Sequence, residues 1–164
     1  MTTASPQVQG GKARRFDSVE QEAYLNLWRT YDRLRGLEDE LFARHELTAQ
    51  QYNALRLLKA AHPQRVATLE LGSRLVSRAP DITRLVDRLA ERGLVDRERP
   101  VDNRRVVTVG ITPAGVELLR QLASEVRACH ARQVGHLSAG EMRTLVELLK
   151  KARGPHEGEG SEWK

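Results

Sequence analysis

A change of hydrophobic period at Gly93 constrains the fold of this chain more than any other feature of its sequence. Before it, apolar side chains recur at the spacing of an α-helix, at Ile82, Leu85, Val86 and Leu89. After it, they alternate as in a β-strand, at Val107, Val109 and Ile111. We therefore predict a helix that ends at Gly93, strands over residues 94–99 and 105–111, and a turn over residues 100–104 between them.

Helical patterns account for most of the remaining chain. A long helix is expected from Ser18 to about Arg44, and further helices are expected to begin at Thr48, Thr68, Ser77, Thr112 and Ser138. A Gln or Glu three residues after Ser18, Thr48 and Ser138 completes a capping-box pattern. Ser77 is expected to cap the helix that carries Ile82, with Pro80 in its first turn.

The order of elements over residues 68–111 is a short helix, a turn, a second helix and a hairpin. This order is that of a winged helix-turn-helix, in which the second helix enters a DNA major groove. We expect a mainly α fold with a small two-stranded β wing and with dimerisation helices at both ends of the domain. The expected boundaries are a flexible arm at 1–17, a domain at 18–153 and a flexible tail at 154–164. Within the domain, the dimerisation helices are about 18–45 and 113–153, and the DNA-binding lobe is about 48–112.

The charge of the chain is consistent with a polyanionic partner. The net charge is +5, and 22 of the 27 basic residues are Arg. Guanidinium groups bind phosphate and guanine in a planar, bidentate manner, which favours nucleic acid, and the alternative explanation of the arginine excess is a GC-rich genome. The segment 74–105 contains nine Arg and six Asp or Glu, so it supplies +3 of this charge.

The candidate DNA contacts lie on the outward face of the second helix and at the tip of the hairpin. We expect the helix to enter the major groove and the hairpin to reach the adjacent minor groove and its phosphates. These residues are Arg78, Pro80, Thr83, Arg84, Arg88, Arg104 and Arg105. Arg84 either pairs with a guanine or contacts phosphate alone. The alternative function is a winged-helix module that binds another protein, which would need exposed apolar residues on this face.

Three stretches carry a resemblance to the MarR family of bacterial transcription regulators: LTAQQYNALRLL (47–58), ITRLVDRLAERGLVDRE (82–98) and RRVVTVGITPAG (104–115). The resemblance spans about residues 20–150. It implies a winged-helix homodimer that binds a pseudo-palindromic operator. In the family, this DNA binding is usually relieved by a small ligand or by oxidation. Thr83 and Arg84 match the family's base- and phosphate-contacting positions, and Arg105 matches its wing arginine.

One position departs from the family pattern. The family usually has Asp two residues before the wing arginine, where it orients the guanidinium, and this chain has Asn103 there, beside Asp102. Either Asp102 takes that role through a shifted turn, or Arg105 is held less firmly.

Other candidate sites have ordinary structural explanations as alternatives. Trp28, Tyr31 and Tyr52 match the aromatic lining of a ligand cleft that the resemblance implies, although aromatic residues at helical spacing are commonly core residues. Cys129 lies on an apolar helix face and is interpreted as a small core residue, with a redox-sensing role as the alternative. The histidines lack the spacing of a metal site, which leaves a metal-responsive regulator as a minor alternative.

No catalytic motif is found, so we predict neither an enzyme nor a cofactor. The predicted function is that of a sequence-specific transcriptional regulator, in particular a ligand-responsive repressor. Its partners would be double-stranded DNA, a second copy of the chain and a small-molecule effector, with no membrane. The single cysteine, and the lack of a leader or an apolar span, favour the bacterial cytoplasm, with nucleoid association through DNA.

Overall fold

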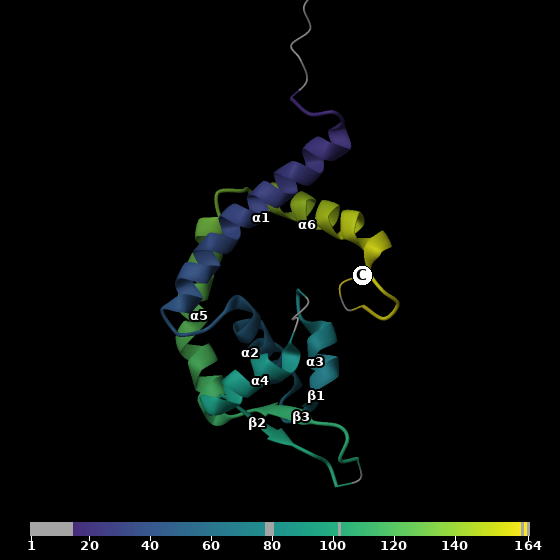
Figure 1. Ribbon diagram of the computed structural model, residues 1–164. Helices are drawn as coiled ribbons and strands as arrows, with labels where there is room; N and C mark the ends of the chain where they lie inside the picture. The colour runs from purple at the N-terminus through teal and green to yellow at the C-terminus, as the bar shows by residue number, and fades with distance from the viewer. Residues whose placement is uncertain (1–14, 78–80, 102, 162, 164) are drawn as a thin grey trace, which may run out of the picture. The chain divides into compact units, whose positions relative to one another are not determined.

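The computed structural model describes residues 15–77, 81–101, 103–161 and 163. The chain divides into two units, residues 1–35 and 36–164. Its elements are α1 (Val19–Ala43), α2 (Ala49–Ala61), β1 (Val66–Ala67), α3 (Thr68–Arg74), α4 (Ile82–Glu91), β2 (Val95–Glu98), β3 (Thr108–Ile111), α5 (Pro113–Val134), α6 (Ala139–Arg153) and the 3₁₀ turn η1 (Gly154–His156) (Figure 1).

Helix α1 begins where the sequence predicts, but its capping differs in one detail. The backbone N–H of Gln21 donates to Ser18 Oγ at 3.1 Å. The Gln21 side chain accepts from the backbone N–H of Asp17 at 2.8 Å, one residue before the position that a capping box requires. Most side chains of α1 are exposed, and its buried residues are Leu41 and Phe42 near the C-terminal end.

The predicted caps of α2, α5 and α6 are confirmed. Thr48 and Gln51 form a complete capping box, and so do Ser138 and Glu141. The Thr112 side chain accepts from the Gly115 N–H at 3.1 Å, and Pro113 occupies the first turn of α5. These contacts satisfy N–H groups that a helix leaves unpaired at its start, which is why local sequence fixes these three boundaries.

The predicted start of α4 is wrong. Its N-cap is Asp81, whose carboxylate accepts from the Arg84 N–H at 2.9 Å, and the Ser77 hydroxyl instead accepts from Gln50 Nε2 at 3.2 Å. Proline disfavours helical backbone in the residue that precedes it, so Pro80 argues against a helix that begins at Ser77. The predicted end is confirmed, since Gly93 follows the helix with a φ of +67°.

The sheet has three antiparallel strands in the order β1–β3–β2. The two strands of the hairpin are shorter than predicted, and Val95 pairs with Ile111 while Glu98 pairs with Thr108. The third strand, β1, pairs Val66 with Val109 and was not predicted. It is too short for a hydrophobic period to reveal it.

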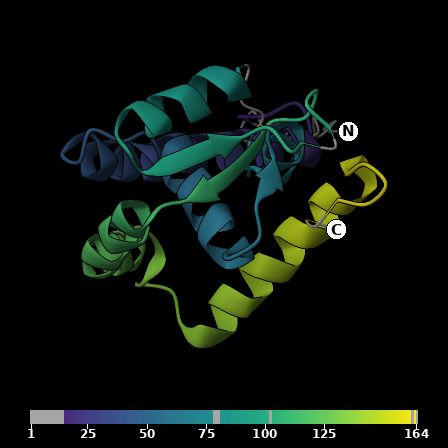
Figure 2. The ribbon, with the colours of Figure 1, turned by 90° about the horizontal axis from the view of Figure 1, so that it is seen from below.

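One apolar core joins the sheet to helices α2, α3, α4 and α5 and to the end of α1. Its fully buried side chains include Leu55, Leu71, Leu89 and Leu122. Helix α6 contributes no buried residue, and it stands apart from the sheet in both ribbon views (Figures 1 and 2). Among the described residues, no helix combines the length and apolar character that crossing a membrane requires.

Candidate nucleic-acid interface

Helix α4 buries one face and leaves the other to solvent, as its period predicts. Leu85, Val86 and Leu89 are buried, and Thr83, Arg84, Arg88 and Glu91 are exposed. Arg78 and Pro80, two further predicted contacts, lie outside the described residues. The exposed face of α4 in the described range therefore consists of polar and charged side chains.

Asp87 of α4 contacts the hairpin. It is half-buried, and its carboxylate forms an ion pair with the Arg97 guanidinium on β2. This ion pair joins α4 to β2 of the hairpin. The helical period of α4 alone could not predict this ion pair, because Arg97 lies on a different element.

Main-chain and side-chain hydrogen bonds connect the described residues at the tip of the wing. Asn103 N–H donates to the Pro100 carbonyl at 3.2 Å, and Val106 N–H donates to the Asn103 carbonyl at 3.1 Å. Arg99 Nη1 donates to the Arg104 carbonyl at 3.0 Å. Asn103, Arg104 and Arg105 are exposed, so the guanidiniums at the tip face solvent.

Asn103 contacts the backbone of the wing arginine. Its side-chain Oδ1 accepts from the backbone N–H of Arg105 at 3.3 Å, so Asn103 holds the main chain that carries the guanidinium. This is the local side-chain-to-backbone contact that Asn commonly makes in turns. Asp102, the other candidate for orienting Arg105, lies outside the described residues.

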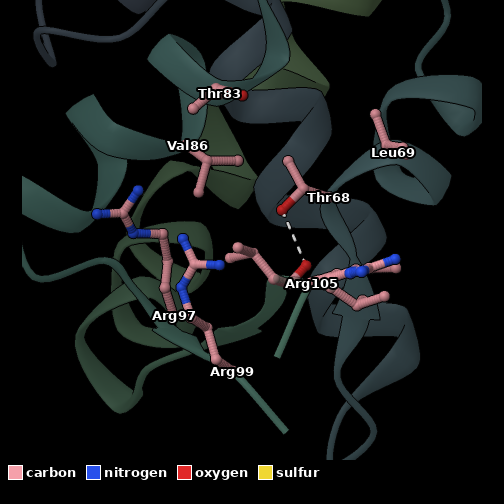
Figure 3. A pocket seen from close by; sticks show the side chains of 10 residues that line it. Thr68, Leu69, Thr83, Val86, Arg97, Arg99 and Arg105 are labelled. Carbon is pink, nitrogen blue, oxygen red and sulfur yellow. Dashed lines mark hydrogen bonds between the residues drawn. The ribbon is translucent and has the colours of Figure 1, made fainter. Parts of the chain in front are cut away.

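A cavity of about 330 Å³ lies between α3, α4 and the wing. Thr83 and Val86 line it from above, Arg97 and Arg99 lie on one side, and Arg105 lies on the other side below Leu69 (Figure 3). Two of its lining residues are joined by a hydrogen bond, in which Thr68 Oγ1 donates to the Val107 carbonyl at 3.0 Å (Figure 3). The cavity thus brings together two predicted contacts, Thr83 and Arg105, that are far apart in sequence.

A second hollow of about 200 Å³ is lined by residues of α2 and by residues at and after the start of α4. Arg84 and Arg88 line it together with Asp81 and Gln51. The predicted contacts on α4 therefore divide between its two sides, with Thr83 toward the wing and Arg84 and Arg88 toward α2.

The structure adds arginines that the sequence reasoning did not single out. Arg97 and Arg99 line the larger cavity, and their place in a charged strand gave no sign of which face each would occupy. Arg92 has a structural role, since it donates to the carbonyls of His45 and Glu46 at 3.2 and 2.6 Å. The excess of arginine in segment 74–105 thus includes residues that serve the fold.

The three aromatic residues predicted to line a ligand pocket do not line either of these cavities. Tyr52 is half-buried and stacks on Phe42 with ring centroids 4.6 Å apart, and burial raises the pKa of its hydroxyl. Trp28 and Tyr31 are 61% and 57% exposed on α1. Tyr52 therefore has a core role, while Trp28 and Tyr31 remain available to a partner.

Cys129 is buried in the core on α5. Burial first, and then the nearby charge of Glu38, raise the pKa of its thiol above the ordinary value. The reactive species of cysteine is the thiolate, so this environment lowers the reactivity of Cys129. Within the described ranges, no group of three or more His, Cys, Asp or Glu converges as metal ligands would.

These features define a winged helix-turn-helix protein of the DNA-binding class. A family model described as MarR family matches residues 47–107. Two known proteins are similar over most of the chain. The HTH-type transcriptional regulator YkoM of Bacillus subtilis is 30% identical over 141 residues, covering 84% of this chain and 90% of YkoM. A MarR transcription factor from Planctomyces limnophilus is 57% identical, with a TM-score of 0.67 over 83% of this chain and 98% of that structure.

A mutant MarR from E. coli, solved in complex with operator DNA, is 26% identical, with a TM-score of 0.69 over 82% of this chain and 94% of that structure. The chain belongs to the MarR family of transcriptional regulators.

Proposed function

We propose that this regulator binds a specific pseudo-palindromic operator as a homodimer and represses transcription until a small-molecule effector releases it. One observation carries the proposal. The cavity between α4 and the wing is lined by Thr83 from the helix and by Arg97, Arg99 and Arg105 from the hairpin. A helix fitted into a major groove would thereby bring the wing arginines to the adjacent backbone.

The division of roles follows from where each side chain lies. Arg84 is exposed near the start of α4, where a guanidinium reaches base edges. Arg104 and Arg105 are exposed at the wing tip, where contact with phosphate and the minor groove supplies affinity with little base information. The mutant E. coli MarR was solved with operator DNA, which supports the same use of the fold here.

The homodimer rests on exposed apolar side chains at both ends of the domain. Helix α1 exposes Leu27, Trp28 and Tyr31, and helix α6 exposes Leu145 and Leu148. Apolar stripes of this kind on long helices are ordinarily buried against another helix. A two-fold pairing would bury the same stripe on both chains and would present two α4 helices to one duplex.

Repression and its relief are the remaining parts of the proposal. A dimer that covers two successive major grooves would exclude other proteins from that stretch of DNA. Trp28 and Tyr31 offer rigid aromatic surface for an effector, because pockets for small molecules are predominantly apolar and aromatic. A shift in Trp28 fluorescence that accompanies loss of DNA binding would identify an effector.

A protein-binding module is the alternative. Leu69 and Val101 are exposed beside the interface, at 82% and 88%. They are single side chains on different elements, and Arg97, Arg99 and Arg105 line the cavity beside Leu69, which argues against the contiguous apolar patch that such a module needs.

The experiment is selection of DNA from a random-sequence duplex pool of roughly 30 bp, about three helical turns. The proposal expects a symmetric consensus with half-sites about 10 bp apart, bound by two chains. Recovery of unrelated sequences at one affinity would argue against sequence-specific binding. Transcription from a promoter that contains the consensus, measured with and without the protein, then tests repression.

A further inference from the structure

Arg65 spans all three strands of the sheet from its position just before β1. Nη1 donates to Asp96 Oδ1 on β2 at 2.8 Å, and Nη2 donates to the Asp96 carbonyl at 3.1 Å. Nε donates to Thr108 Oγ1 on β3 at 3.3 Å and lies 3.4 Å from Glu98 Oε2. One guanidinium therefore contacts both strands of the wing hairpin from outside it.

Gly110 makes this crossing possible. It pairs with Asp96 in the β2–β3 register, and Arg65 lies at the next position of the β1–β3 register, so the three residues form a row across the sheet. A Cβ at Gly110 would lie 2.9 Å from Arg65 Nη1 and 3.0 Å from Asp96 Oδ1. A side chain there would occupy the space that the guanidinium uses.

The clamp formed by Arg65, Asp96, Glu98 and Thr108 acts close to the base of the wing loop. Glu98 and Thr108 are the last pair of the β2–β3 ladder, and Arg65 contacts both. Beyond this pair, Arg99 and Arg105 line the larger cavity. Because Arg65 holds this last pair of the ladder, it also affects the direction in which the wing loop leaves the sheet.

We propose that Arg65 is a positioning residue that holds the wing against β1 and so sets where Arg99 and Arg105 meet DNA. The proposal rests on the proposed function, in which those arginines contact the duplex. The competing explanation is that Arg65 is a further cation that touches phosphate directly. Its side chain is 27% exposed and lies between two carboxylates, which favours the positioning role.

Removing a negative charge from the clamp separates the two explanations, because they predict opposite changes in DNA affinity. Asp96→Asn removes a negative charge, so electrostatics alone predict tighter DNA binding. The positioning role predicts binding weaker by about threefold or more, because the charge-assisted hydrogen bond from Arg65 is no longer formed. Glu159→Gln is the matched control, since it removes one exposed carboxylate that lies outside both the clamp and the proposed DNA-binding surface, and it is expected to leave affinity unchanged or slightly tighter.

Two further variants hold the charge constant. Arg65→Lys keeps the positive charge, but an ammonium group cannot form the several simultaneous hydrogen bonds of the guanidinium. This variant should therefore bind DNA as weakly as Arg65→Ala. Gly110→Ala keeps Arg65 but displaces its guanidinium, and it should weaken DNA binding to the same extent. If Arg65→Lys binds like wild type, Arg65 is a simple cationic contact and the positioning role is overturned.

A measurement without DNA keeps failure of this proposal distinct from failure of the proposed function. The Thr68 N–H donates to the Val107 carbonyl at 3.0 Å and reports the attachment of β1 to the wing. Arg65→Ala should accelerate hydrogen exchange at Thr68 at least about tenfold and leave amides of the α5 core unchanged. Unchanged exchange, or tighter binding by Asp96→Asn, overturns the clamp. Wild-type DNA binding by Arg105→Ala would overturn the DNA role of the wing instead.

Discussion

The Oδ1 atom of Asn103 accepts a hydrogen bond from the backbone N–H of Arg105 at 3.3 Å, and this contact closes the tip of the wing. Asn103→Ala should therefore loosen the turn that carries Arg105 and weaken DNA binding by about two- to fivefold. Asn103→Ser retains an acceptor and should bind more nearly like wild type. Affinity for the selected duplex measures both. Equal binding by wild type and the Ala variant would show that this turn does not position Arg105.

Arg105 is expected to act on DNA broadly, without reading sequence. Arg105→Ala should lower affinity for all duplexes and flatten the slope of log K against log salt by about 0.9 for each phosphate that the protein no longer neutralises. The matched control is Arg127→Ala, which removes an exposed guanidinium from α5. If both variants change the slope equally, the effect reflects net charge and the wing has no special contact.

Arg84 is expected to read a base. Arg84→Ala should relax preference at one symmetric pair of operator positions, because a bidentate contact with guanine contributes about 1–3 kcal/mol of discrimination. A series of single-base substitutions in the selected duplex measures this preference position by position. An even loss of affinity across the series would assign Arg84 to phosphate contact and leave Arg78 and Thr83 as the candidate base readers.

The helix boundaries show how much of the fold follows from sequence. Thr48, Thr112 and Ser138 start their helices as predicted, because a cap is a contact between residues three apart in sequence. The start of α4 was predicted wrongly because Ser77 and Asp81 both have capping side chains. Only the effect of Pro80 on the preceding residue favours Asp81.

The site was less accessible to sequence reasoning than the fold. Thr83, Arg84 and Arg88 are exposed as the helical period of α4 predicts, but the pairing of Asp87 with Arg97 joins two different elements and has no local sequence signal. The partners of Arg65 lie between 31 and 43 residues away, and no local pattern connects them. Gly110, which a period-two interpretation treats as an ordinary strand position, is the residue that leaves room for the clamp.

Dimerisation is expected to depend on the apolar stripe of α6. Leu148 is 59% exposed in the single chain, and Leu148→Asp would place a charge within the proposed interface. Sedimentation at micromolar concentration should give twice the chain mass for wild type and a lower mass for this variant. Arg143→Asp introduces the same side chain on the opposite face of α6 and should remain dimeric. A wild-type monomer, unchanged on adding DNA, would contradict the two-fold model.

Cys129 is expected to be a core residue and not a redox sensor. Because burial raises the pKa of its thiol, alkylation by iodoacetamide should be slow in the folded protein and should accelerate on denaturation. Mild peroxide should leave DNA binding of wild type and Cys129→Ala equal. Loss of binding in wild type alone, restored by a reductant, would instead identify Cys129 as the sensor.

The most direct test of DNA recognition by α4 and the wing is a dimethyl sulfate footprint on the selected duplex. This reagent reports guanine N7 in the major groove and adenine N3 in the minor groove. Wild type should protect guanines in two major grooves about 10 bp apart and adenines in the flanking minor grooves. Arg105→Ala should lose the minor-groove protection and retain the major-groove protection. Protection in one groove only, or a pattern that Arg105→Ala leaves unchanged, would contradict the account.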